Sequence, residues 1–144
     1  MKKIDVKYIR DTVAEMCIEA NTVLTDDILK EMEVALAREK SPSAIAILET
    51  MIENFEVAEK KEIPICQDTG MAVVFVTMGQ DLQITGGSLE DAIQDGVEKG
   101  YREGYLRKSV VDDPFIRNNT NTNTPAIIHY KVVPGDDLHI KVMP

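Results

Sequence analysis

Residues 71–78 read MAVVFVTM, a valine-rich apolar run in which threonine is the one polar residue. Gly70 and Gly79 stand on its two sides. A continuous apolar stretch of this length is typical of a buried β-strand and is far too short to span a membrane. The chain before this run has the periodicity of helices and much of the chain after it alternates like strands, so the organisation of the chain changes here.

Residues 1–62 predict three amphipathic helices. Asp5, Thr25 and Ser41 precede the three apolar stripes and are residue types that cap helix N-termini, while Pro42 suits a first helical position. We expect the stripes to face the core. They comprise Ile9, Val13, Cys17 and Ala20; then Ile28, Met32, Ala35 and Leu36; then Ile45, Leu48, Met51 or Ile52, Phe55 and Ala58.

After the central strand, a turn at residues 79–81 leads to a short predicted strand at 82–85. Ser88, with Asp91 three residues later, predicts the start of a fourth helix that ends near Leu106. Three glycines at four-residue spacing in this helix indicate close approach of another backbone, since glycine lowers helix propensity. These glycines are Gly96, Gly100 and Gly104.

Residues 126–133 and 138–143 alternate apolar and polar residues around a turn at 134–137, which predicts a β-hairpin with one buried face. That face comprises Ala126, Ile128, Tyr130 and Val132 with Leu138, Ile140 and Val142. The expected fold is α+β, with an N-terminal layer of about three helices packed on a mostly antiparallel or mixed sheet and one further helix.

We expect one domain over residues 1–144, divided into a helical layer at 1–62 and the sheet, fourth helix and loops at 63–144. The 144 residues are 44% hydrophobic and 28% charged, as in ordinary folded domains. An apolar strand that runs up to Pro144 suggests that the natural chain continues, so we expect a truncated fragment.

The net charge of −9 is spread along the chain without a basic stripe, which argues against nucleic acid or an anionic membrane as partner. The N-terminus lacks the continuous apolar stretch of a signal peptide, so we expect a cytoplasmic protein. Its two cysteines, Cys17 and Cys66, are then expected to be free thiols, with Cys17 in the core.

Three polar segments are candidates for chemistry, and each has a structural alternative. Residues 66–69 place a thiol, an amide, a carboxylate and a hydroxyl in succession between a helix and a strand, where loops often hold binding groups. The alternative is a turn in which Asp68 and Thr69 bond local backbone and Cys66 is a small apolar filler.

The second candidate is Arg107, which either binds a carboxylate through two parallel hydrogen bonds or, with Lys108, balances the dipole of the fourth helix. The third is residues 117–125, whose interleaved asparagines and threonines either donate to an oxyanion or build turns. We interpret His129 and His139 as surface residues, and Asp112 and Asp113 as an acidic turn.

Residues 66–70, Leu106 with Arg107, and residues 119–125 resemble, in order and spacing, the N-terminal part of class I (iron–sulfur) fumarate hydratases. The resemblance is greatest to the alpha subunit of the two-subunit form, and L-tartrate dehydratase alpha subunits share the pattern. It implies a hydro-lyase of the tricarboxylic acid cycle that interconverts fumarate and (S)-malate. Asn121 stands where relatives often have glycine.

The resemblance also implies a [4Fe–4S] cluster held by three cysteines, of which Cys66 is one. Gln67, Asp68 and Arg107 would then face a dicarboxylate substrate, with Asp68 as the catalytic residue. Asn119 and Thr120 would bind substrate as well.

The other two cysteines would lie outside this chain, so we expect the isolated chain to be inactive and without a cluster. The expected partners are the missing C-terminal part, a beta subunit and further copies in a homo- or hetero-oligomer. Fumarate and tartrate remain alternatives as substrate. Two other classes remain: a non-catalytic subunit-docking module, and a cysteine-nucleophile enzyme, which is disfavoured because neither histidine is expected to face Cys66.

Overall fold

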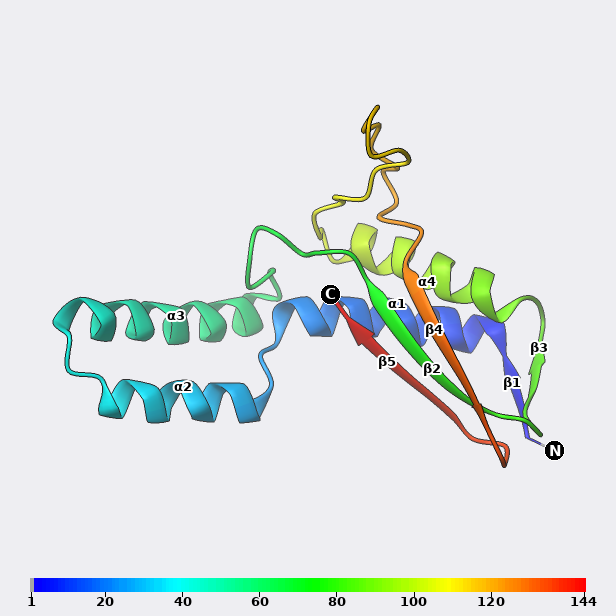
Figure 1. Cartoon of the computed structure of the whole chain (residues 1–144), viewed down its shortest axis with the longest axis horizontal. Coiled ribbons are helices and arrows are strands. Elements are labelled where there is room, and N and C mark those ends of the chain that lie inside the picture. The colour runs from blue at the N-terminus through cyan, green and yellow to red at the C-terminus, as the bar shows by residue number, and fades with distance from the viewer. Residues whose placement is uncertain (1) are drawn as a thin grey trace.

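The computed structural model describes residues 2–144, in which a run of three helices is followed by strands and one further helix (Figure 1). The elements are β1 (Lys3–Asp5), α1 (Val6–Thr22), α2 (Asp26–Arg38), α3 (Pro42–Lys61), β2 (Val73–Gly79), β3 (Gln83–Thr85), α4 (Leu89–Glu103), β4 (Ile127–Val133) and β5 (Leu138–Met143). The α+β class predicted from the sequence is confirmed. Strand β1, which the sequence analysis missed, pairs in parallel with β3.

The larger sheet is mixed and has the strand order β4-β2-β5. Strand β2 is parallel to β4 and antiparallel to β5, so the predicted hairpin of the last two strands is wrong. The connection between them passes around the end of β2, where Gly79 N–H donates to the Asp137 carbonyl at 2.7 Å. A side chain at Gly79 would overlap the backbone of Gly135 and Asp136, so glycine at this position permits the crossing.

One face of this sheet packs on α1 and α4, which lie side by side behind the strands in Figure 1. The largest fully buried side chains come from these helices and from β2, except for Asn123, which lies in the loop before β4. They are Tyr101, Ile9, Ile93, Val13, Val74, Val76, Val97, Asn123 and Cys17. The predicted stripe of the first helix is therefore confirmed as core, with Ala20 half-buried at its end.

The glycines of α4 allow the two helices to touch. A Cβ at Gly96 would stand 2.6 Å from the Arg10 carbonyl oxygen, and one at Gly100 would stand 2.7 Å from the Ala14 carbonyl oxygen. Since real Cβ atoms do not approach so closely, the close backbone contact predicted from the four-residue spacing is confirmed.

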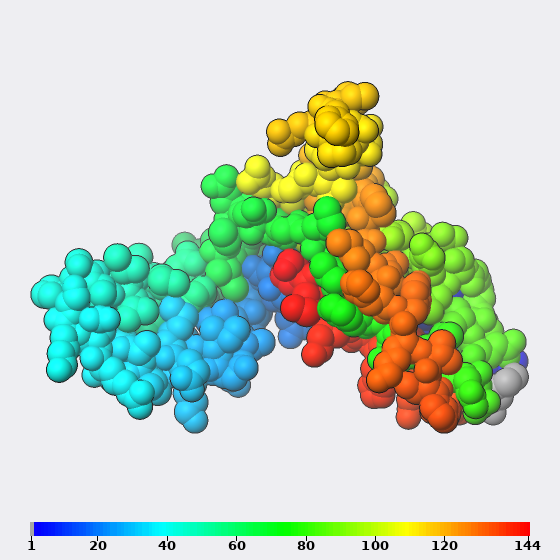
Figure 2. Space-filling model, viewed as in Figure 1, coloured from blue at the N-terminus to red at the C-terminus, as the bar shows by residue number. Residues whose placement is uncertain are grey.

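Helices α2 and α3 form an arm that projects away from the sheet (Figures 1 and 2). No residue of α2 is buried, and Ala58 is the buried residue of α3. Ile28 and Ala35 of the predicted α2 stripe are exposed, while Met32 and Leu36 are only half-buried. The core predicted for α2 is therefore wrong, because this helix packs mainly against α3. Asp5 and Ser88 cap α1 and α4 as predicted, whereas Thr25 and Ser41 occupy N-cap positions without a side-chain hydrogen bond to the helix.

The predicted buried face of β4 is covered only in part. Tyr130 and Val132 are 47% and 62% exposed, whereas Leu138, Ile140 and Val142 on the corresponding face of β5 are half-buried. No helix within residues 2–144 has both the length and the apolar character needed to cross a membrane.

Candidate active site

The three polar segments singled out in the sequence meet at one end of α4. The second and third segments lie in the yellow loops at the top of Figures 1 and 2, and the first segment lies in the green loop between α3 and β2. Thr69 Oγ1 donates to the Arg107 carbonyl oxygen at 2.9 Å, which joins the first segment to the second. Asn119 Nδ2 donates to the Lys108 carbonyl oxygen at 2.7 Å, which joins the third segment to the second.

Asn123 connects all three segments. Its side chain is fully buried, and Oδ1 accepts from the N–H groups of Ser109 and Val110 at 2.7 and 3.1 Å. Its Nδ2 donates to the Gly70 carbonyl oxygen at 3.1 Å. Sequence reasoning placed Asn123 in a polar loop but gave no sign that its amide is buried.

Tyr101 holds the first segment by a hydrogen bond from α4. This fully buried residue of α4 donates its hydroxyl to the Thr69 carbonyl oxygen at 2.6 Å. Burial raises the pKa of Tyr101 to about 12, so the hydroxyl keeps its proton and remains a donor. The sequence analysis missed this residue. The available signal was a tyrosine in the apolar stripe of a helix, since a buried phenol needs a polar partner.

Arg107 follows α4 rather than ending it. The helix stops at Glu103, earlier than predicted, and Tyr105 has a φ of 53° that takes the chain out of helical geometry. The basic residue of the last helical turn is Arg102. Arg107 is exposed, and none of the four ion pairs within residues 2–144 includes it. Its guanidinium is therefore available to an anion.

Cys66, Gln67 and Asp68 are exposed on a loop that is anchored at both ends. Before them, Ile65 N–H donates to the Asn21 carbonyl oxygen at 2.8 Å; after them, Gly70 is held by Asn123. Asp68 Oδ1 accepts from Gly70 N–H at 3.2 Å, as the turn alternative predicted for this carboxylate. The exposed thiol of Cys66 does not fit the other part of that alternative, an apolar filler.

The third segment is irregular backbone held by hydrogen bonds to the loop after α4 and within itself. Thr120 N–H donates to the Val110 carbonyl oxygen at 3.0 Å, and Asn121 N–H donates to Asn119 Oδ1 at 2.7 Å. Asn121 has a φ of 62°, a left-handed conformation that asparagine tolerates and glycine adopts freely. This backbone conformation would therefore also accept glycine at position 121.

The remaining candidates lie as interpreted from the sequence. Asp113 Oδ1 accepts from the N–H groups of Phe115 and Ile116, both at 2.8 Å, so the acidic pair forms a turn. His129 and His139 are exposed on the sheet. No group of three His, Cys, Asp or Glu side chains within residues 2–144 is placed to hold a metal ion.

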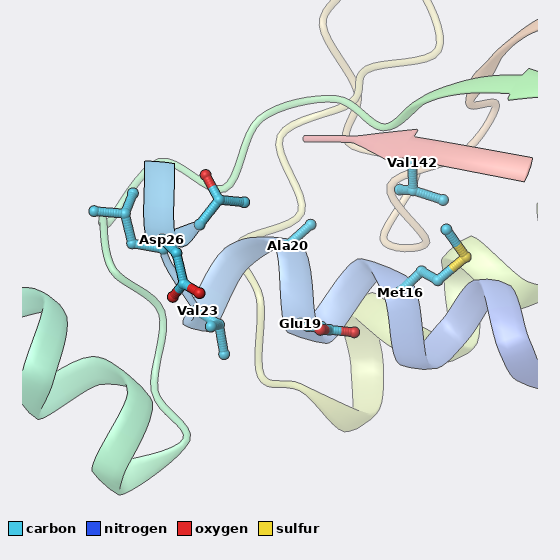
Figure 3. Close-up of a pocket in the computed structure, with 8 residues that line it drawn as sticks. Met16, Glu19, Ala20, Val23, Asp26 and Val142 are labelled. Carbon is cyan, nitrogen blue, oxygen red and sulfur yellow. The ribbon is translucent and has the colours of Figure 1, made fainter. Parts of the chain in front are cut away.

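A separate hollow lies where α1 ends, beside β5 (Figure 3). Its lining is mostly apolar, with Met16, Ala20, Val23 and Val142 among the residues. None of the candidate site residues lines this hollow, so it is separate from the candidate site.

The chain belongs to the fumarate hydratase (Fumerase) family, whose model matches residues 10–144. The match includes all three segments of the candidate site and the whole of the larger sheet.

Among its relatives are tartrate dehydratase alpha subunits and class I fumarate hydratases. A putative L(+)-tartrate dehydratase subunit alpha from Methanocaldococcus jannaschii is 35% identical over 116 residues, which are 80% of this chain and 40% of that relative. An L(+)-tartrate dehydratase subunit alpha from Escherichia coli UTI89 is 28% identical over 144 residues, 98% of this chain and 47% of the relative. The anaerobic class I fumarate hydratase of Escherichia coli K12 is 40% identical over 88 residues, 60% of this chain and 16% of the relative. This chain spans less than half the length of each.

Proposed function

We propose that this chain forms part of an iron–sulfur hydro-lyase that adds water reversibly to fumarate to give (S)-malate. In this reaction a hydroxyl joins one carbon of the double bond and a proton joins its neighbour. Membership of the fumarate hydratase family supports the reaction class. The observation that carries the assignment to these residues is the Thr69–Arg107 hydrogen bond, which puts the Cys66 loop beside the exposed arginine.

Arg107 is proposed to bind a substrate carboxylate. The chain has a net charge of −9, so a dianionic substrate needs a local cation to overcome the overall field. A guanidinium forms two parallel hydrogen bonds with a carboxylate, and its availability here supports that role. Gln67 and Thr120 are proposed as further polar contacts. Asn119 keeps one amide N–H beyond the bond to Lys108 and is proposed to donate it to substrate.

Asp68 is proposed to exchange the proton of the reaction. It is exposed on the same loop as Cys66, and its Oδ1 is oriented by the Gly70 N–H. A carboxylate held by one backbone donor keeps other lone pairs for a substrate or a water molecule.

Cys66 is proposed to supply one thiolate ligand of a [4Fe–4S] cluster. Its thiol is exposed and fits a ligand role, while Cys17 is buried in the core, so this chain fits one ligand and the others would come from outside residues 2–144. Lewis-acid polarisation of the substrate hydroxyl is the chemistry that such a cluster supplies when bound. The missing C-terminal part and a beta subunit are the proposed partners, in a cytoplasmic assembly.

The test is anaerobic reconstitution of the complete complex with Cys66→Ser and with Cys17→Ala as the matched control. We expect Cys66→Ser to lose the broad visible absorbance of the cluster and the hydratase activity, while Cys17→Ala keeps both. Equal absorbance and activity in wild type and Cys66→Ser would remove Cys66 from the ligand set and favour a docking module.

L(+)-tartrate is the second candidate substrate. Two relatives named as tartrate dehydratase subunit alpha align over 80% and 98% of this chain, more than the anaerobic fumarate hydratase does. Malate and tartrate are both four-carbon dicarboxylates and differ by one hydroxyl, so Arg107 would serve either. Turnover of malate against tartrate by the complete complex decides between them.

A further inference from the structure

We propose that Asn123 is a positioning residue of this site, assisted by Tyr101. Together they fix the carbonyl groups of Gly70 and Thr69, and thereby set where Asp68 and Cys66 stand relative to Arg107. This inference rests on the proposed function for its catalytic consequence, but its structural part can be tested without activity.

The first argument is connectivity. Within residues 2–144, Asn123 is the one side chain that hydrogen-bonds to both of the other segments of the site. Its acceptor holds Ser109 and Val110, which follow Arg107 by two and three residues, and its donor holds Gly70, which follows Asp68 by two. A shift of this amide would therefore change the spacing between the two proposed functional groups.

The second argument is the chain of contacts that leads to the carboxylate. Asn123 Nδ2 binds the Gly70 carbonyl at 3.1 Å, and the N–H of the same Gly70 binds Asp68 Oδ1 at 3.2 Å. The Tyr101 hydroxyl holds the preceding carbonyl, that of Thr69, at 2.6 Å. Two adjacent carbonyls fixed by buried donors leave the loop little freedom to rotate.

The third argument is that the position suits asparagine in both backbone and side chain. Asn123 has a φ of 59°, a left-handed conformation in which asparagine is one of the few tolerated residue types. Its side chain is fully buried, and an unsatisfied amide there would be costly. Glycine would satisfy the backbone alone, and aspartate would keep the acceptor but lose the donor.

The test compares Asn123→Asp with Asn121→Asp in the 144-residue chain. Asn121 lies in the same loop with a similar φ of 62°, is exposed, and its amide bonds only Asn119, so it controls for charge and backbone. By amide exchange, we expect residues 66–72 to open roughly tenfold more readily in Asn123→Asp and within about twofold of wild type in Asn121→Asp. The alkylation rate of Cys66 should change in Asn123→Asp and not in the control.

Unchanged exchange and alkylation in Asn123→Asp would overturn the proposal. A uniform rise that includes the core of α1 would overturn it too, because that result means general loss of stability. If Asn123→Asp does not fold, Asn123→Gly and Tyr101→Phe take its place, with the exposed Tyr8→Phe as control. Asn123→Gly and Tyr101→Phe are expected to increase amide exchange in residues 66–72, and Tyr8→Phe is not.

In the complete complex, Asn123→Asp should lower kcat at least tenfold, while the control Tyr8→Phe, at an exposed residue outside the proposed site, matches wild type. If the wild-type complex is active, equal kcat values in the two variants would overturn the positioning role. If the wild-type complex is inactive but Asn123→Asp still speeds amide exchange of residues 66–72, the result would count against the proposed function alone.

Discussion

At the residue scale, the two cysteines differ sharply in their exposure to solvent. Cys17 is 1% exposed between α1 and α4, and burial raises its pKa from 9.0 to about 12. Cys66 is exposed on a polar loop. Since the thiolate is the reactive form, only Cys66 should react near neutral pH in the folded chain.

This difference predicts one alkylated cysteine per native chain at pH 8 and two after denaturation. Mass spectrometry of proteolytic peptides identifies the modified residue. Native alkylation of Cys17 at a rate comparable to Cys66 would mean that the α1–α4 contact opens readily.

Arg107→Lys tests the proposed carboxylate contact in the complete complex. Lysine keeps the charge but cannot form the two parallel hydrogen bonds, a loss of about 1.5–3 kcal/mol, or roughly tenfold to a hundredfold in kcat/KM. Arg102→Lys is the matched control, since Arg102 lies in the last turn of α4 and outside the proposed site. Steady-state kinetics measure both, and equal kcat/KM in the two variants would remove Arg107 from the site.

At the element scale, the contact between α1 and α4 depends on the absence of side chains at the α4 glycines. Gly100→Ala would place a Cβ 2.7 Å from the Ala14 carbonyl oxygen and 2.9 Å from Cys17 Cβ. Overpacking of this kind costs about 1–3 kcal/mol, against a gain of about 1 kcal/mol in helix propensity. Both partner atoms lie on a packed helix and cannot rotate away.

Because both neighbouring atoms are fixed, we expect the upper part of this cost, so that Gly100→Ala lowers the free energy of unfolding by a net of about 1–2 kcal/mol, measured by chemical denaturation. Gly87→Ala serves as control, because a Cβ there would meet only Val6 Cγ2 at 3.4 Å, an ordinary contact. A Gly100→Ala chain as stable as Gly87→Ala would show that the helices can separate without cost.

The sequence predicted which segments form helices and strands better than which strands are neighbours. Apolar periodicity specifies the buried face of an element, and it identified Val13 as core. The continuous apolar run at 71–78 predicted a strand buried throughout, and this was only partly right, because Val76 is buried while Phe75 on the other face of β2 is 42% exposed. An apolar pattern contains no information on what lies beside a strand, so β2 between β4 and β5 was not anticipated. The same limit applies to the site: the polar segments were identified, but the buried links through Tyr101 and Asn123 depend on tertiary packing.

At the scale of the whole molecule, the proposed cluster would find one exposed cysteine within residues 2–144. Cys66 is the exposed thiol of the chain, and the other cysteine is buried in the core. We therefore expect the 144-residue chain, treated anaerobically with iron and sulfide, to take up no stoichiometric [4Fe–4S] cluster and to remain colourless. Visible absorbance and iron analysis measure this outcome. A stable cluster in the chain alone would mean that ligands other than three cysteines hold it.

The stability of the whole molecule should depend on pH through two groups in its core, Cys17 and Tyr101. Burial is the main cause that raises both pKa values in the folded chain, from 9.0 and 10.0 to about 12, and the thiolate of Cys17 would further raise that of Tyr101. Both groups are neutral when protonated, so the unfolded chain loses these protons at lower pH than the folded chain does. Their contribution to stability is fully present below pH 9 and is lost as pH rises toward 12.

Denaturant midpoints at pH 8, 9.5 and 11 measure this loss, which cannot exceed about 1.4 kcal/mol per pH unit for each titrating group. Cys17→Ala and Tyr101→Phe should each flatten the alkaline fall, because each removes one titrating proton. Tyr8→Phe is the matched control, since Tyr8 is 71% exposed, and it should fall as steeply as wild type. A wild-type chain equally stable at pH 8 and 11 would contradict the burial of both groups. The same fall in all three variants would assign it to charges elsewhere on this acidic chain.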